Sequence, residues 1–251
     1  MVEKDTAKVS IVGAGMIGRP GVAAQMFNSL AGAGVNIQMI STSEVKVSCV
    51  VDVSDCDRAI AALCNTFEIN FSSTSLTSPS PKSPAVRGVA LDMNQARIAI
   101  RQLPNRPGMA AKLFGLLAEY NVSVDMIIQS QRCRIVDGVP RRDIAFTVAR
   151  MDADNAQEKL IAVAKEFDWG EVVLDKAIAK VSIVGSGMVG QPGIAAKMFT
   201  ALAQNHINIQ MIATSEIKIS CVVGEDDGVK ALQVIHSAFN LAGSEKFVVP
   251  V

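Results

Sequence analysis

Hydrophobic and polar positions in the first third of the chain follow two periods, one of helices and one of strands. Apolar residues between Val22 and Leu30 fall on one helical face, and they do so again within Asp55–Glu68. Strict alternation marks strands with one buried face. The predicted strands are Val9–Val12, Val35–Met39, Val45–Val51 and Ile69–Phe71, with a turn at Ser41–Ser43. This order predicts a β-α-β-β-α-β unit, the ferredoxin-like arrangement.

The same pattern returns twice later in the chain. Lys8–Val51 aligns with Lys180–Val223 at an offset of 172, and 30 of the 44 positions are identical. A fainter copy lies between them, where Pro107-Gly108 matches Pro20-Gly21 at an offset of 87. A repeat at a fixed period indicates one structural unit used several times. The predicted fold class is therefore α+β, with tandem ferredoxin-like units, antiparallel sheets and helices on one face.

Composition divides the chain into three units. Residues 76–87 are rich in serine and proline, which is typical of a flexible linker. The predicted domains are 1–75, 88–176 and 177–251, separated by this linker and by a short junction near residue 176.

Charge and cysteine content narrow the class of protein. There are 24 basic and 24 acidic residues, so a basic nucleic-acid surface is not expected. No apolar run approaches the roughly 20 residues of a membrane span. Five cysteines without a C-x-x-C pair argue against a disulfide framework, and two histidines leave little material for a metal site. We expect a cytoplasmic protein without a metal, a membrane contact or a nucleic-acid partner.

Two glycine-rich turns fit the G-x-G-x-x-G pattern, one from Gly13 to Gly18 and one from Gly185 to Gly190. This pattern is the dinucleotide fingerprint, so an NAD(P)-binding oxidoreductase fragment is the alternative function. That fingerprint needs an acidic residue about 20 positions further on, at the end of the second strand. Val35–Ser43 contains none. The following strand also turns directly into a hairpin, which disfavours the alternative.

The same turns are better suited to binding a small amino acid than a dinucleotide. Free N–H groups at a helix N-terminus, here Gly21, Val22 and Ala23, favour a carboxylate. Asn36 and Asn208 lie on the next strand, and Asp125 in the middle unit suits a cationic group. The simpler alternative is that both asparagines only solvate an open sheet face.

Three stretches give the chain a family resemblance. AKVSIVGAGM, RPGVAAQMF and VNIQMISTSEVKVSCVV, with their copies near the C-terminus, resemble the second regulatory repeat of aspartate kinases. The middle stretch, Gly88–Arg150, is similar to the first regulatory repeat of that family. Such repeats are ACT domains, which are amino-acid-sensing modules. The order resembles the cyanobacterial four-ACT type without its kinase domain and first ACT repeat.

The resemblance implies a regulatory function. In the family, lysine and threonine bind between paired ACT domains and inhibit the kinase by feedback, within aspartate-family amino-acid biosynthesis. The resemblance implies ATP and magnesium only for the catalytic domain of the full-length kinase. The KFGGT-like motif of that domain has no counterpart here. This chain is therefore not expected to phosphorylate aspartate or to need a cofactor. The implied partners are the effectors, a kinase domain or catalytic subunit, and a second copy in a homodimer through the ACT sheets.

The resemblance also implies effector-binding residues. The middle unit contributes a loop and a strand, and the outer units contribute asparagine strands that reach across from a partner unit. These residues are Asn105, Pro107, Gly108, Met109 and Ala110, then Val124, Asp125 and Gln129, and finally Asn36, Ile37, Asn208 and Ile209. Gly88–Met93 resembles a strand that relatives donate to the following repeat. The third unit is thus expected to borrow residues 88–93, and the first unit, without a donor strand, is expected to be the least stable.

Overall fold

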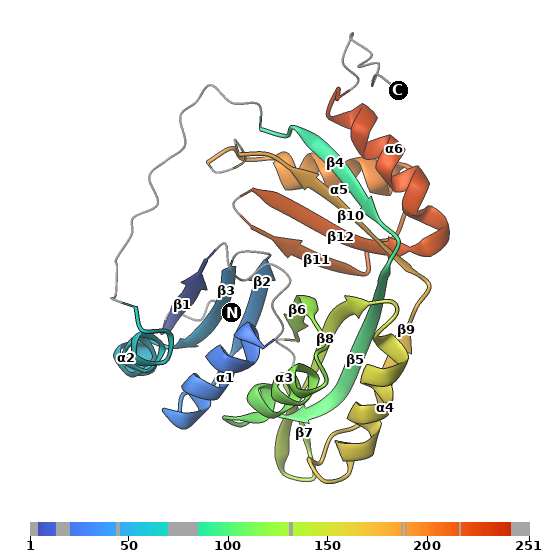
Figure 1. The fold of residues 1–251 in the computed structure, drawn as a ribbon. Coiled ribbons are helices and arrows are strands. Elements are labelled where there is room, and N and C mark those ends of the chain that lie inside the picture. Colours follow the sequence, from blue (N-terminus) through green and yellow to red (C-terminus); the bar gives the residue numbers. More distant parts are fainter. Residues whose placement is uncertain are drawn as a thin grey trace. The chain divides into compact units, whose positions relative to one another are not determined.

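Two compact units make up the structure, a computed structural model that describes residues 5–13, 21–43, 46–69, 85–130, 133–186, 188, 190–215 and 217–241. Unit 1 combines Met1–Thr74 with Asn94–Lys176, and unit 2 combines Ser75–Met93 with Ala177–Val251. The first and middle repeats therefore share one unit, and the third repeat forms the other. Each unit is an antiparallel α+β sheet structure, as the hydrophobic pattern predicted (Figure 1).

Unit 1 is built on one sheet, of which the structure describes eight strands. The main path runs β1-β3-β2-β6-β8-β5-β9, and β7 pairs with β8 outside it. The strands are β1 (Thr6–Val12), β2 (Met39–Ser43), β3 (Lys46–Asp52), β5 (Gln95–Pro104), β6 (Val124–Gln129), β7 (Arg134–Val136), β8 (Val139–Ala149) and β9 (Val172–Asp175). The helices are α1 (Val22–Gly32), α2 (Cys56–Phe67), α3 (Met109–Glu119) and α4 (Ala153–Ala164). Their apolar faces and the sheet enclose one continuous core.

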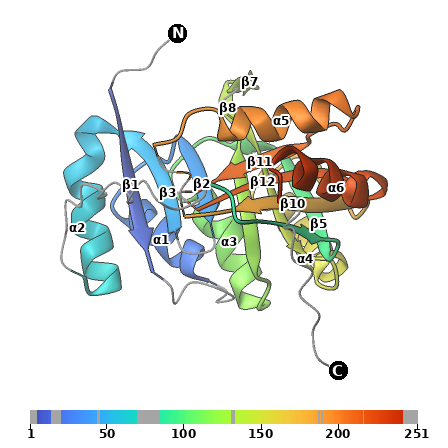
Figure 2. The same cartoon turned by 90° about the horizontal axis from the view of Figure 1, so that it is seen from above.

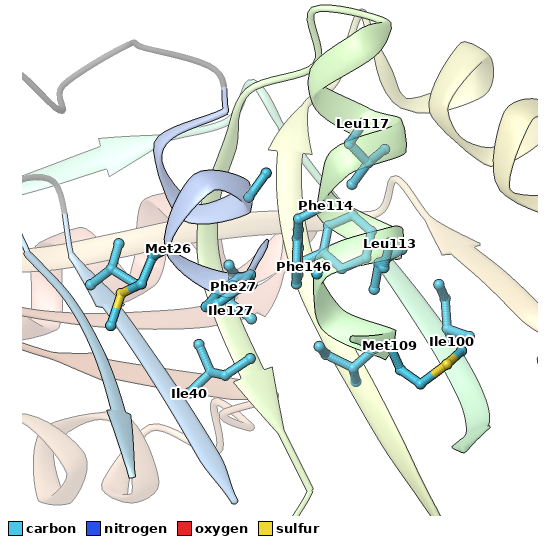
Figure 3. Packing of buried hydrophobic residues seen from close by; sticks show 14 of the residues in the cluster. Met26, Phe27, Ile40, Ile100, Met109, Leu113, Phe114, Leu117, Ile127 and Phe146 are labelled. Carbon is cyan, nitrogen blue, oxygen red and sulfur yellow. The ribbon is translucent and has the colours of Figure 1, made fainter. Parts of the chain in front are cut away.

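The first and middle repeats join through β2 and β6. Ser41 pairs with Ile128 in antiparallel register, and the Thr42 hydroxyl donates to the Asp125 carbonyl at 2.9 Å while accepting from the Ile127 N–H at 2.9 Å. Above this junction the Phe27 ring of α1 lies 5.3 Å from the Phe114 ring of α3 (Figure 3). Hydrogen bonds and aromatic packing thus hold the two repeats side by side.

This junction corrects one prediction. We predicted a strand over Val35–Met39 and a turn at Ser41–Ser43, but β2 covers Met39–Ser43. Ser41 and Thr42 pair with β3 on one side and lie against β6 on the other. Short polar residues favour turns when their side chains bond locally, whereas here the Thr42 hydroxyl is used across the sheet.

In its described residues, unit 2 is a four-stranded sheet in the order β11-β12-β10-β4. Its strands are β4 (Gly88–Asp92), β10 (Ile178–Val184), β11 (Met211–Thr214) and β12 (Lys218–Gly224), and its helices are α5 (Ile194–Gln204) and α6 (Gly228–Ala238). Figure 2 shows the two helices from above. β4 precedes the middle repeat in the sequence, yet it pairs with β10 of the third repeat, with Asp92 opposite Lys180. The third repeat therefore includes a strand from a distant part of the chain.

The predicted linker ends earlier than expected. Val86 is buried in the core of unit 2, and the Arg87 N–H donates to the Val184 carbonyl at 2.8 Å. Residues 85–87 are thus part of a packed unit, because they lead β4 onto β10. The rest of the linker and most of the predicted strand Ile69–Phe71 lie outside the described residues.

Two equivalent cysteines, Cys49 and Cys221, are fully buried in the two cores. Burial raises the pKa of each thiol from 9.0 to about 12. We expect both to resist thiol reagents at pH 8 in the folded protein, because only the thiolate reacts. Above pH 9 the unfolded chain loses these protons while the folded chain keeps them, so the free energy of unfolding should fall between about pH 9 and 12. Urea unfolding at pH 8 and 10.5 measures this loss, and a Cys49→Ala/Cys221→Ala variant should show a smaller one.

Candidate functional site

Three helices begin directly after a glycine in the left-handed region. Gly21, Gly108 and Gly193 have φ angles of 91°, 89° and 94°, which L side chains rarely adopt. In each helix the glycine carbonyl accepts the first helical hydrogen bond. The Lys112 N–H, for example, donates to the Gly108 carbonyl at 2.9 Å. The N–H groups at positions such as Ala110 and Ala111 therefore have no intrahelical acceptor. Each turn offers donors and a positive dipole end to an anion.

Helices α1 and α3 pack side by side in opposite directions. A Cβ atom built at Gly108, where α3 begins, would lie 3.8 Å from the Cβ of Ala31 near the end of α1. A Cβ atom at Gly21, where α1 begins, would lie 3.5 Å from the Cβ of Ala118 near the end of α3. The N-terminus of each helix thus lies next to the C-terminus of the other. We call the end of unit 1 where α3 begins the first end, and the end where α1 begins the second end.

The first end collects most of the predicted effector residues. The loop Asn105–Ala110 follows β5, and the Asn105 N–H donates to the Pro140 carbonyl at 2.7 Å. Arg142, beside this loop on β8, donates to the Gln38 carbonyl at 2.5 Å. Asn36 and Ile37, which follow α1, are therefore brought to the same end of the sheet from the other repeat.

Gln129 belongs to this first end as well. It is the last residue of β6 and lies opposite Ile144 of β8, two positions from Arg142. Its Oε1 atom is buried and has no hydrogen-bond partner among the residues that the structure describes. An unpaired buried acceptor is costly, so its presence in a folded protein needs an explanation. A bound ammonium group would supply the missing donor.

Val124 and Asp125 lie at the second end. Strand β6 runs from Val124 to Gln129, so roughly 17 Å of extended chain separates the two ends. Val124 follows α3, whose last turn contacts Gly21 at the start of α1. We expected Val124 and Asp125 to share a site with Asn105–Ala110, but the antiparallel helices bring them to the turn before α1 instead. Residues 14–20 of that turn lie outside the described residues.

Asn208 and Ile209 belong to unit 2. Asn208 is exposed, and Ile209 packs on the core of the third repeat just before β11. Among the described strands, β11 pairs only with β12, whereas its counterpart β2 also pairs with β6. The two residues therefore belong to a different unit from Asn105–Ala110.

Two residues of the site were not predicted from the sequence. The Thr42 hydroxyl links the strands of the two repeats by a hydrogen bond to the Asp125 carbonyl, and Arg142 of β8 donates a hydrogen bond to the Gln38 carbonyl. Thr42 recurs in the third repeat as Thr214, so the repeat itself contained a signal. Arg142 gave none, because its role depends on a pairing between repeats.

The strands before the two glycine-rich turns belong to a fold that differs from the dinucleotide-binding one. β1 and β10 have antiparallel neighbours, whereas the fingerprint belongs to a parallel doubly wound sheet. A Cβ atom at Gly185 would lie 2.1 Å from the carbonyl oxygen of Ala85. Glycine is needed at this position because another backbone segment passes directly beside it. Within the part of the chain that the structure describes, no helix is long and apolar enough to cross a membrane.

Comparison with protein families identifies the repeats. Residues 9–67 and 181–239 match one ACT-domain family model, and residues 97–165 match a second ACT-domain model. The first relatives found are aspartokinases, such as that of Corynebacterium efficiens, which is 38% identical over 162 residues. The alignment covers 64% of this chain and 38% of that protein. The chain thus spans less than half the length of these curated relatives.

Solved structures of high similarity come from the same group. Aspartate kinase from Synechocystis is 63% identical with a TM-score of 0.90, and the match covers 100% of this chain and 42% of that one. The ligand-free regulatory subunit of aspartate kinase from Thermus thermophilus is 46% identical with a TM-score of 0.56. That match covers 62% of this chain and 99% of the subunit. The chain therefore belongs to the ACT-domain regulatory regions of the aspartate kinase family.

Proposed function

We propose that this chain is an allosteric regulatory region of an aspartate kinase, which binds lysine, threonine or both and transmits feedback inhibition to a kinase domain. A solved relative, Escherichia coli aspartokinase III, is described as a complex with lysine and aspartate in a T-state. In this proposal the effector favours one arrangement of ACT repeats, and that arrangement inhibits the catalytic partner. ATP and magnesium belong to that partner.

One observation carries the proposal. At the first end of unit 1, the start of α3 at Gly108, Met109 and Ala110 lies at the same end of the sheet as Gln129, whose buried Oε1 has no hydrogen-bond partner among the described residues. An amino acid carries a carboxylate that suits free N–H donors and an ammonium group that suits an unpaired oxygen. In this proposal Asn105, Pro107, Asn36 and Ile37 contribute to the same effector site.

The second end offers a related site. Asp125 and Val124 lie near the start of α1, where Gly21 and Val22 again offer helix donors. A carboxylate at this end suits the side-chain ammonium of lysine. Asn208 and Ile209, just before β11, supply one half of a further site in this proposal, which a partner ACT repeat would complete at the edge of β11 that no described strand covers.

Calorimetric titration of the purified chain tests the function. We expect heat from lysine or threonine at millimolar concentration or below, and none from NADH. Heat from NADH alone would overturn the regulatory assignment. Absence of heat from both amino acids, with a folded unit 1, would contradict the effector sites within this chain.

Gln129→Leu distinguishes binding from folding. Leucine has a similar volume and removes the unpaired oxygen, so we expect unchanged or slightly higher thermal stability. Loss of the hydrogen bond to the ammonium group should weaken effector binding about 10-fold or more. Titration and thermal unfolding of the same sample measure both effects.

Asp125→Ala is the matched variant for the second end. It should weaken lysine and leave the affinity for threonine at the first end unchanged, since only lysine has a second ammonium group. Unchanged lysine binding in this variant would remove Asp125 from the effector sites.

A further inference from the structure

Strand β5 is irregular close to the point where it leads into the loop Asn105–Ala110. Its register with β8 shifts there, so that two residues of β5, Arg101 and Gln102, oppose the single residue Asp143 of β8. Gln102 has a φ angle of 55°, which is uncommon for a residue with a side chain. Its N–H donates to Asp143 Oδ1 at 2.9 Å. The arrangement is a β-bulge, a feature that often redirects the chain beside a functional site.

A second irregular segment, Asp168–Gly170 between α4 and β9, lies directly against this bulge. Asp168 also has a left-handed conformation, with a φ angle of 58°. The Gly170 N–H donates to the Arg101 carbonyl at 3.0 Å, and a Cβ atom at Gly170 would lie 2.6 Å from that oxygen. Glycine is needed here because the two backbone segments are in contact.

One arginine side chain joins the two segments. Arg141 of β8 is 9% exposed, and its Nη1 atom donates to the Gln102 carbonyl at 3.0 Å and to the Asp168 carbonyl at 2.6 Å. Its Nη2 atom donates to Asp168 Oδ2 at 2.6 Å. A lysine cannot reproduce this set, because an ammonium group lacks the planar fork of a guanidinium group. We refer to Arg101, Gln102, Arg141 and Asp168–Gly170 together as the bulge cluster.

The bulge cluster lies at the base of the loop Asn105–Ala110. Arg141 lies opposite Pro104, the last residue of β5, in the register of the sheet. The carbonyl of Pro140, the residue before Arg141, accepts the hydrogen bond from the Asn105 N–H at 2.7 Å. The loop therefore starts from a part of the sheet that the Arg141 side chain holds on both strands.

The corresponding loop of the first repeat is longer. Its first strand aligns with β5 at an offset of 89, which places Ala7 on Ala96, whereas its Pro-Gly pair aligns at an offset of 87, which places Pro20 on Pro107. The middle repeat thus has two residues fewer between the strand and the helix. A shorter connection leaves the loop fewer conformations, so its geometry depends more strongly on its base.

We propose that Arg141 is a positioning residue for the effector site at the first end, an inference that rests on the function proposed above. Through the bulge cluster it holds Asn105–Ala110 in the conformation that directs the first N–H groups of α3 to the carboxylate of the effector. Arg141 acts through the loop and not by contact with the effector. Binding is tighter because the loop is ordered before the ligand arrives.

Arg141→Lys tests the proposal, with Arg97→Lys as the matched control. Arg97 donates to Asp175 Oδ2 at 2.7 Å near the other end of β5, so each variant keeps the charge of an arginine that pairs with an aspartate. We expect Arg141→Lys to weaken threonine or lysine binding at the first end about tenfold in calorimetry. Hydrogen exchange of the Asn105 amide should become about tenfold faster. Arg97→Lys should leave both quantities unchanged.

Asp168→Asn is a milder variant of the same cluster. Asparagine tolerates the left-handed conformation, and the two carbonyls that accept from Arg141 Nη1 remain in place. Only the charge-assisted bond of Nη2 is weakened. We expect a smaller loss of affinity, about two- to threefold, in a protein as stable as the Arg97→Lys control.

The tryptophan of the bulge cluster supplies a further signal. Trp169 is the single tryptophan of the chain, is 7% exposed, and packs on Phe167 with 5.1 Å between ring centroids. Its emission should shift to longer wavelength in Arg141→Lys, because a loosened segment admits water to the ring. The same emission should stay unchanged in Arg97→Lys.

The possible outcomes separate the proposal from the function on which it rests. Unchanged Asn105 exchange and Trp169 emission in a folded Arg141→Lys protein would overturn the proposal, as would an equal loss of affinity in Arg97→Lys. Faster exchange with unchanged affinity would show that effector binding does not depend on the position of the loop. A wild-type chain that binds neither amino acid would contradict the proposed function instead, and the Asn105 exchange would then decide by itself whether Arg141 holds the loop.

Discussion

Phe27→Ala should destabilise unit 1 by about 3–5 kcal/mol. Phe27 is 1% exposed and packs against Phe114 at 5.3 Å between α1 and α3, and Phe114 in turn lies 5.5 Å from Phe146 of β8. Truncation leaves a cavity between the two repeats, at the contact of α1 with α3. Since both proposed effector sites need the two helices side by side, any effector binding there should fall with stability. Urea unfolding and calorimetry measure the two effects.

Phe199→Ala is the matched control. Phe199 occupies the same position in the third repeat, at an offset of 172 from Phe27, but it is only partly buried. We expect a loss of about 1–2 kcal/mol, confined to unit 2, with the proposed effector sites of unit 1 unchanged. Equal losses in the two variants would contradict a special role for the junction between the first and middle repeats.

Gly185→Ala should destabilise unit 2 by about 3 kcal/mol. The added Cβ atom would lie 2.1 Å from the Ala85 oxygen, 2.8 Å from the Ala85 carbonyl carbon and 2.9 Å from Val86 Cα. All three are backbone atoms, so a side-chain rotation cannot relieve the clash. The segment that leads into β4 must shift, and the hydrogen bond from Arg87 to Val184 should weaken with it. Thermal unfolding and exchange of the β4 amides report both changes.

Gly13→Ala is the control for this variant, because Gly13 matches Gly185 in the first repeat. No described segment corresponding to residues 85–87 lies at the edge of β1. We expect a loss below about 1 kcal/mol, typical of a substitution without a steric cost. A loss as large as that of Gly185→Ala would mean that another segment passes beside Gly13.

The repeats themselves could be predicted because each contains its own local signals. Alternation and helical spacing identify a strand or a helix within about ten residues, and they recur in all three copies. Pro-Gly before α1, α3 and α5 marks the helix starts, and the buried positions of Met26 and Cys49 return as Met198 and Cys221. The boundary of β2 was missed, since its polar residues resemble a turn until a second repeat pairs with them.

The candidate site was predicted only in part for the same reason. Loop Asn105–Ala110 and Gln129 belong to one repeat, so their association follows from a single motif. Which strand faces that loop depends on the neighbour, and the antiparallel packing of α1 on α3 brings Asn36 there and Asp125 to the other end. No local pattern contains that information.

The sequence by itself determined the unit, its threefold use and the family resemblance, because these depend on contacts within some 70 residues. Tertiary structure decided which edges pair. β1 and β10 are almost identical in sequence, yet only β10 is covered by β4, where Gly185 and Gly228 leave room for the donated strand. Strand pairing uses backbone groups that every strand carries. Which strand pairs at a given edge is therefore decided by the few side chains beside that edge, and not by the sequence of the strand alone.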